Sequence, residues 1–173
     1  WANSLKEIGN DEHSELRGEL RSSFLKFREN TSHLVSQIAK QLPGLTQHEI
    51  SHLDALWEAG SLICGDNYPL NPLEAFVFGG AVLLHDSALC FEAYDNGIIG
   101  VRDTITWKDS YSIAKEEGNN ISDDECKAIA DFSALRYLHS KQAEKLTEKS
   151  WLDPETNQPI FLIENVNLRK HLG

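Results

Sequence analysis

The sequence predicts an all-α fold: a helical bundle with one short hairpin or extended segment near residues 151–163. Apolar residues recur every three or four positions along most of the chain, which is the period of an amphipathic helix. Three helix-start signals stand in the sequence, whereas only residues 159–163 resemble a strand. With 173 residues, 40% of them apolar and 25% charged, we expect one domain over residues 1–173.

Residues 1–44 are predicted to form an N-terminal helical segment that packs on the core. One face repeats at intervals of three or four residues, which indicates one long helix or two helices with a break near Asn30. Pro43 and Gly44 end the segment. The positions of that face are Leu16, Leu20, Phe24, Phe27, Thr31, Leu34 and Ile38.

Two further helices are predicted in the middle of the chain, each beginning at a capping box. In Thr46-x-x-Glu49 the hydroxyl accepts a hydrogen bond from a free backbone amide, and the glutamate accepts one from the cap residue. Asn71 and Glu74 form the same pattern. The residues that follow, 75–84, are apolar on all sides, so we expect this helix to be the buried centre of the fold.

The C-terminal half is predicted to contain two helices before the hairpin and one short helix after it. A third capping box, Ser122-x-x-Glu125, begins the longer of the first two helices. In chain order we expect a loop over 91–105, a helix over 107–117, a long helix to about Lys149, a turn over 153–157, a strand over 159–163 and a short helix from Asn165.

The charge of the chain excludes several classes of partner. The 16 basic and 27 acidic residues give a net charge of −11 and a pI near 5.0, so we expect neither nucleic acid nor an anionic membrane as a partner. The longest uncharged apolar run, residues 75–84, is too short to cross a bilayer. Three cysteines without metal-ligand spacing fit a cytoplasmic location. Because the chain starts with Trp1 and contains no methionine, we expect a fragment of a longer protein.

Two adjacent side chains that can bind metals, His85 and Asp86, follow the apolar helix directly. Burying an imidazole and a carboxylate at this position costs on the order of several kcal/mol unless they are paired or bind a ligand. The pair therefore predicts one of two arrangements. It is either a metal site, or a structural pair in which Asp86 accepts hydrogen bonds from a helix N-terminus and His85 is a satisfied core histidine.

Two other pairs have helical spacing. His48 and His52 are four residues apart, so we expect them on one face of a helix, either as metal ligands or as part of an ordinary polar surface. Arg136 and His139 are three residues apart on the long helix. A guanidinium can hold a phosphate through two parallel hydrogen bonds, and the alternative is again a solvated helix surface.

Taken together, these residues resemble the HD superfamily of metal-dependent phosphohydrolases, which carries a histidine on one helix and a His-Asp doublet at the end of the next. Here the corresponding residues are His52 and Leu83-Leu84-His85-Asp86. Residues 45–90 carry the strongest resemblance, which is nearest to an HD-like domain that precedes a GHKL-type, Hsp90-like ATPase domain in bacterial multidomain proteins. The resemblance implies an HD-domain-like helical bundle.

The resemblance also implies a role for each candidate residue. The implied metal ligands are His52, His85 and Asp86, of which Asp86 is able to bridge two ions, with His48 as an auxiliary ligand. The implied catalytic residues, which would face the substrate phosphate, are Arg136 and His139. The implied cofactor is a divalent metal: Mn, Fe, Ni, Co, Zn or Mg. The family's closing aspartate would be Asp123, Asp124, Asp131 or Asp153, or a residue beyond Gly173.

Two functions follow from the resemblance. The first is a metal-dependent phosphohydrolase that acts on a nucleotide or another phosphate ester. The second is a catalytically degenerate HD-like sensor or regulatory module, attached to an Hsp90-like ATPase domain of the same protein. The ligand would be a phosphorylated small molecule in the first case, and the partner would be the C-terminal ATPase domain in the second.

Overall fold

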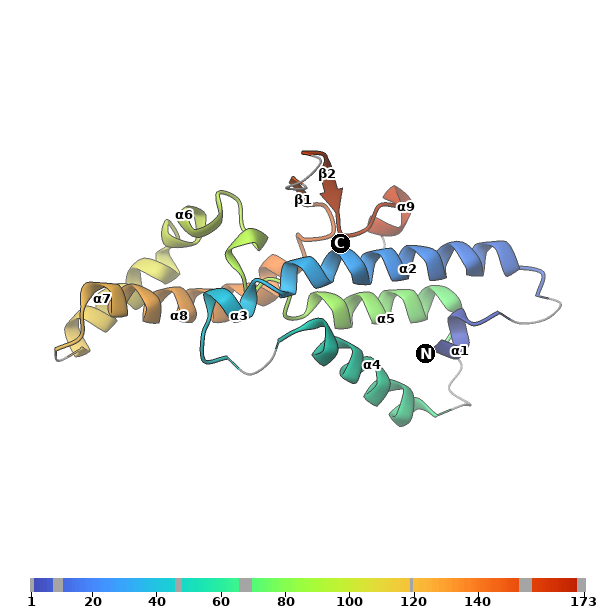
Figure 1. Ribbon diagram of the computed structural model, residues 1–173, viewed down its shortest axis with the longest axis horizontal. Helices are drawn as coiled ribbons and strands as arrows, with labels where there is room; N and C mark the ends of the chain where they lie inside the picture. The colour runs from blue at the N-terminus through green and yellow to red at the C-terminus, as the bar shows by residue number, and fades with distance from the viewer. Residues whose placement is uncertain are drawn as a thin grey trace.

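The computed structural model of the chain describes residues 2–7, 11–45, 48–65, 70–118, 120–152 and 157–170. These residues form a helical bundle with a two-stranded sheet beside it (Figure 1), which confirms the predicted all-α class and the hairpin. In chain order the elements are α1 (Ala2–Leu5), α2 (Ser14–Val35), α3 (Ile38–Gln41), α4 (Ile50–Cys64), α5 (Pro72–Leu84), the 3₁₀ turn η1 (Phe91–Ala93), α6 (Gly97–Arg102), α7 (Ile105–Glu117), α8 (Asp123–Ala143), β1 (Ser150–Leu152), β2 (Pro159–Phe161) and α9 (Val166–Arg169).

The long helix α2 lies alongside α5 (Figure 1), and the two helices share one hydrophobic core. Phe27 and Val35 of α2 and Phe76 of α5 are almost completely buried there. Of the two alternatives for the N-terminal segment, the continuous helix is correct as far as Val35. No break occurs at Asn30, whose buried side-chain amide instead donates a hydrogen bond to the carbonyl oxygen of Phe161 at 2.7 Å and so ties α2 to the hairpin.

Helix α5 begins with the predicted capping box. The Oδ1 atom of Asn71 accepts from the backbone N–H of Glu74 at 3.0 Å, and Oε2 of Glu74 accepts from the N–H of Asn71 at 2.8 Å. The prediction that this helix is buried on all sides is wrong, because Phe78 is 46% exposed. Helices α1, α2 and α4 pack against α5 and leave part of its circumference uncovered.

Residues 91–105, predicted as a loop, contain η1 and the short helix α6. The predicted turn at Asn96-Gly97 is present, with φ angles of 60° and 57°, but it forms the beginning of α6. Val101 of α6 is fully buried in the core. Burial of Val101 depends on how α6 packs against η1 and α8, and local turn signals do not show such packing, which explains the error.

Helices α7 and α8 pack against each other at one end of the molecule (Figure 1). Ser122 and Glu125 form the third predicted capping box at the beginning of α8. The helix ends at Ala143, earlier than the predicted end near Lys149, because the chain turns over residues 144–148 and places Leu146 in the core.

The hairpin pairs β1 with β2 in antiparallel register, with Trp151 opposite Ile160. The Nε1 atom of Trp151 donates to the carbonyl oxygen of Glu92 at 2.8 Å, so the hairpin is also joined to η1. The short helix predicted from Asn165 is α9, and the Asn165 side chain accepts from two of its backbone amides. In the described parts of the chain, no helix combines the length and the apolar character that a membrane span requires.

Candidate metal centre

The candidate metal centre lies where the beginning of α4 meets the end of α5. His52 lies in the first turn of α4, His85 is the C-cap of α5 and Asp86 is the next residue. The chain then turns into the core, and residues 87–90 are completely buried. The hydroxyl of Ser87 donates to the carbonyl oxygen of Leu83 at 2.5 Å, so the backbone that carries the doublet is held on both sides.

One carboxylate oxygen faces three imidazoles. The Oδ2 atom of Asp86 lies 2.9 Å from Nε2 of His85, 3.7 Å from Nε2 of His48 and 3.8 Å from Nε2 of His52. The ligand atoms of His52, His85 and Asp86 lie within 4.8 Å of one another. Only 13% of the Asp86 side chain is exposed, so its charge must be balanced locally. Imidazole nitrogens around one carboxylate suit Mn, Fe, Ni, Co or Zn.

Hydrogen bonds orient the ring of His85. Its Nδ1 atom lies 2.7 Å from the carbonyl oxygen of Val82, and because a carbonyl can only accept, Nδ1 carries a hydrogen. The Nε2 atom therefore faces Asp86 with either a proton or a metal ion. The hydrogen bond to Asp86 raises the pKa of His85 above its ordinary value, although burial opposes this.

The same cluster that raises the pKa of His85 lowers the pKa of Asp86. Burial by itself raises the pKa of the Asp86 carboxyl. The hydrogen bond with His85 and the neighbouring imidazoles of His48 and His52 outweigh burial, so the pKa lies below its ordinary value. The carboxylate is thus held ionised at neutral pH, which is the state that a metal ligand requires.

His48 reaches Asp86 from outside the helix. The prediction that His48 and His52 share one helix is wrong, because Glu49 has an extended backbone with ψ at 171° and acts as the N-cap of α4. The predicted capping residue Thr46 lies outside the described residues. The ring centroids of His48 and His52 are nevertheless 5.7 Å apart, and the extended segment brings both side chains to the same carboxylate.

Arg136 and His139 both lie on α8, as predicted. The Arg136 side chain is exposed, and Nδ1 of His139 lies 2.7 Å from the carbonyl oxygen of Arg136. Among the described residues, the group that could hold a metal ion does not include His139. Contact of this pair with a substrate phosphate stays a prediction.

The predicted candidates for a closing carboxylate are Asp123, Asp124, Asp131 and Asp153. Asp131 is buried and accepts from Nε and Nη2 of Arg102 at 3.0 and 2.7 Å and from Nε1 of Trp107 at 2.7 Å. Asp123 and Asp124 form ion pairs with lysines, and Asp153 lies outside the described residues. Asp86 is therefore the one carboxylate in the metal-capable group found among the described residues.

The segment that anchors Asp86 was missed in the sequence. The sequence predicts no structural element over residues 87–90, yet their burial determines where the carboxylate points. The available signal was the uncharged run Ser87-Ala88-Leu89-Cys90-Phe91 directly after the doublet. Such a run after a helix end indicates that the chain continues into the core instead of returning to the surface.

The model of one protein family, described as HD-CE, matches residues 42–173. The matched region contains every residue of the histidine–carboxylate cluster around Asp86. No curated protein and no solved structure matches the chain.

Proposed function

Because the chain belongs to the HD-CE family, and is therefore an HD-like domain, we propose that it is a metal-dependent phosphohydrolase-type domain acting on a nucleotide or another phosphate ester. One observation carries the proposal: Oδ2 of Asp86 faces the Nε2 atoms of His48, His52 and His85 at 2.9–3.8 Å. A nearly buried carboxylate surrounded by imidazoles is a ligand set typical of divalent transition metals.

The residues of the cluster would divide the work of holding the ion. His52, His85 and Asp86 would be its ligands, and His48 would add a further nitrogen or a hydrogen bond to Asp86. The carbonyl oxygen of Val82 fixes the His85 ring so that Nε2 points into the cluster. When bound, a divalent ion such as Mn, Fe, Ni, Co, Zn or Mg supplies Lewis acidity and activates water near neutral pH.

The substrate side of the proposal rests on Arg136 and His139. The Arg136 guanidinium is exposed and therefore accessible to a phosphate. With a net charge of −11, the chain has no broad basic surface, so a phosphorylated substrate would depend on local positive charge at the metal. This favours small phosphate esters and nucleotides over long nucleic acids.

A second candidate function is a catalytically degenerate HD-like regulatory module that is attached to an Hsp90-like ATPase domain. One observation favours it: Asp86 is the only carboxylate in the metal-capable group among the described residues. Clamping a phosphate between two ions requires more ligands than this group offers.

The test is elemental metal analysis of the chain, purified without an affinity tag or chelator, together with the variants His85→Ala and Asp86→Asn. His33→Ala is the matched control, because His33 is exposed on α2. The expected result is one or two equivalents of a divalent transition metal, absent from both site variants and retained in the control. Helical circular dichroism should be unchanged in all three variants.

Hydrolysis of p-nitrophenyl phosphate, bis(p-nitrophenyl) phosphate and nucleotides then separates the two functions. Release of phosphate or nitrophenol that depends on metal and on Asp86 supports the phosphohydrolase. Stoichiometric metal without turnover of any of these substrates supports the regulatory module. A metal-free protein whose melting temperature falls in His85→Ala and Asp86→Asn would show that the cluster is structural.

A further inference from the structure

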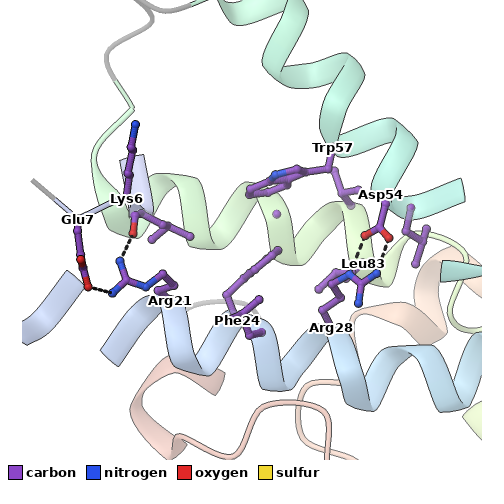
Figure 2. A pocket seen from close by; sticks show the side chains of 13 residues that line it. Lys6, Glu7, Arg21, Phe24, Arg28, Asp54, Trp57 and Leu83 are labelled. Carbon is purple, nitrogen blue, oxygen red and sulfur yellow. Dashed lines mark hydrogen bonds and ion pairs between the residues drawn. The ribbon is translucent and has the colours of Figure 1, made fainter. Parts of the chain in front are cut away.

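A pocket of about 740 Å³ lies between α1, α2, α4 and α5 (Figure 2). This volume is within the range of about 300–1,000 Å³ that is typical of small-molecule sites. The wall is mostly apolar, and its seven large apolar residues are Leu5, Phe24, Leu25, Leu53, Trp57, Val82 and Leu83. None of the residues that face Asp86 lines the pocket, but the pocket adjoins the metal centre through Val82, whose carbonyl oxygen holds the His85 ring.

The middle of the pocket is built around an aromatic pair. Trp57 from α4 and Phe24 from α2 stack with ring centroids 4.9 Å apart (Figure 2). A Cβ atom at Gly79 would lie 2.1 Å from Trp57 and 2.6 Å from Phe24, so only glycine allows both rings to lie this close to α5. Because Gly79 has no side chain, the two rings can pack directly against the backbone of α5 and form the wall of the pocket.

Polar groups stand at the two ends of the pocket (Figure 2). At one end, Arg28 on α2 forms a bidentate ion pair with Asp54 on α4, with Nε 2.7 Å from Oδ1. The two charges at this end cancel, and the pair ties α4 to α2 across the edge of the pocket. This end therefore gives no preference for the charge of a ligand.

The end beside α1 carries excess positive charge. Arg21 donates to the carbonyl oxygen of Leu5 at 2.9 Å and to Glu7 at 3.2 Å. Lys6 lines the same pocket, and its side chain extends to the side of this end opposite Arg21 (Figure 2). Among the described residues that line this mouth, two cations and one carboxylate leave a surplus of one positive charge, and the side chain of Glu7 is 88% exposed and thus screened by water.

We propose that this pocket binds an amphipathic monoanion, with an alkyl chain between Trp57, Phe24 and the aliphatic wall and a carboxylate at the α1 end beside Lys6 and Arg21. We infer an alkyl chain because the wall between the two charged ends is apolar. We infer a single carboxylate because only one end has a surplus of positive charge. Burial of each further methylene group should strengthen binding by about fourfold at most, so affinity increases with chain length.

Calorimetric titration of the metal-free chain with sodium decanoate below its micellar concentration, in EDTA and low salt, tests the proposal. We expect saturable 1:1 binding that is weaker for hexanoate and for neutral decanol. Lys6→Glu should weaken decanoate binding about fivefold, because a surface ion pair contributes up to about 1 kcal/mol, which is a factor of about five in affinity. Lys40→Glu on α3, which does not line the pocket, is the matched control and should bind as the parent does.

A filling variant tests the location. Leu25 lines the pocket but is 60% exposed, so Leu25→Trp can occupy the mouth without disturbing the core, and it should weaken decanoate binding at least tenfold. Three results would each overturn the proposal: no saturable binding of decanoate, equal binding of decanoate and decanol in both the parent and Lys6→Glu, or undiminished binding to Leu25→Trp. Unchanged binding by His85→Ala would show that the site does not depend on the proposed metal function.

Discussion

Replacing Asp131 with alanine is expected to destabilise the fold by about 3 kcal/mol. The Asp131 side chain is 11% exposed, and its carboxylate accepts hydrogen bonds from Arg102 on α6 and Trp107 on α7. It therefore joins three helices, with donor–acceptor distances of 2.7–3.0 Å. Removing one partner of a buried ion pair costs about 3–5 kcal/mol. The lower end applies here because the Arg102 side chain is 35% exposed and regains water in the variant.

Urea denaturation followed by circular dichroism measures this loss. In a thermal melt of this 173-residue chain, a loss of about 3 kcal/mol in the free energy of unfolding should lower the melting temperature by roughly 6–12 °C. Asp124→Ala is the matched control, because Asp124 is an aspartate on the same helix, in the first turn of α8, and its side chain is 94% exposed. The control should change stability by less than about 0.5 kcal/mol.

A double-mutant cycle with Arg102→Ala isolates the ion pair. We expect a coupling energy of about 1–3 kcal/mol between the two substitutions, as is typical of residues in one buried network. A change below 1 kcal/mol in Asp131→Ala would refute the assignment of Asp131 to a structural network. The same variant should keep its metal content, and loss of metal with unchanged stability would identify Asp131 as the closing metal ligand instead.

Three further predictions concern packing and ionisation. Gly79→Ala should lower the free energy of unfolding by about 1–3 kcal/mol and shift the fluorescence of Trp57, because the new methyl group overlaps that ring. Gly18→Ala is the control and should be neutral or stabilising, because its added Cβ meets no atom within 4 Å. Equal effects of the two substitutions would contradict the close approach of the Trp57 ring to Gly79. Burial raises the pKa of the Cys90 thiol from 9.0 to about 12, so N-ethylmaleimide at pH 8 should label half-buried Cys64 long before Cys90, and the reverse order would be inconsistent with the structure. The Cys90 thiol ionises at a lower pH in the unfolded chain than in the folded protein. The stability that protonated Cys90 contributes is therefore complete below pH 9.0 and is lost as pH rises towards about 12. Urea denaturation midpoints of the parent and of Cys90→Ala across that pH range would measure this loss.

Local signals predicted the helix beginnings that depend on residues within one turn. The capping boxes at Asn71 and Ser122 are present as expected, because each requires only hydrogen bonds between residues three apart. The prediction was less successful where the end of an element depends on distant packing. Leu146 is buried against residues far away in sequence, so α8 stops before its helical pattern ends.

The metal centre shows the same division. The adjacency of His85 and Asp86 at the end of an apolar helix was sufficient to select these residues from the sequence. Helical spacing predicted that His48 and His52 lie close together, and they do, but for a different reason, because an extended residue separates them. The approach of α4 to α5, and not the interval along one helix, brings both imidazoles to the carboxylate.

By itself, the sequence determined the all-α class, two of the capping boxes and the adjacent pair His85-Asp86 as a candidate for metal binding, since all of these follow from residue type and short-range spacing. Only the tertiary structure decided that Asp131 belongs to a buried ion pair, that Gly79 admits an aromatic pair, and that a pocket lies between four helices. The physical reason is that each of these features depends on the angle and distance between helices. Those quantities result from packing the whole core, and no single segment of the chain contains them.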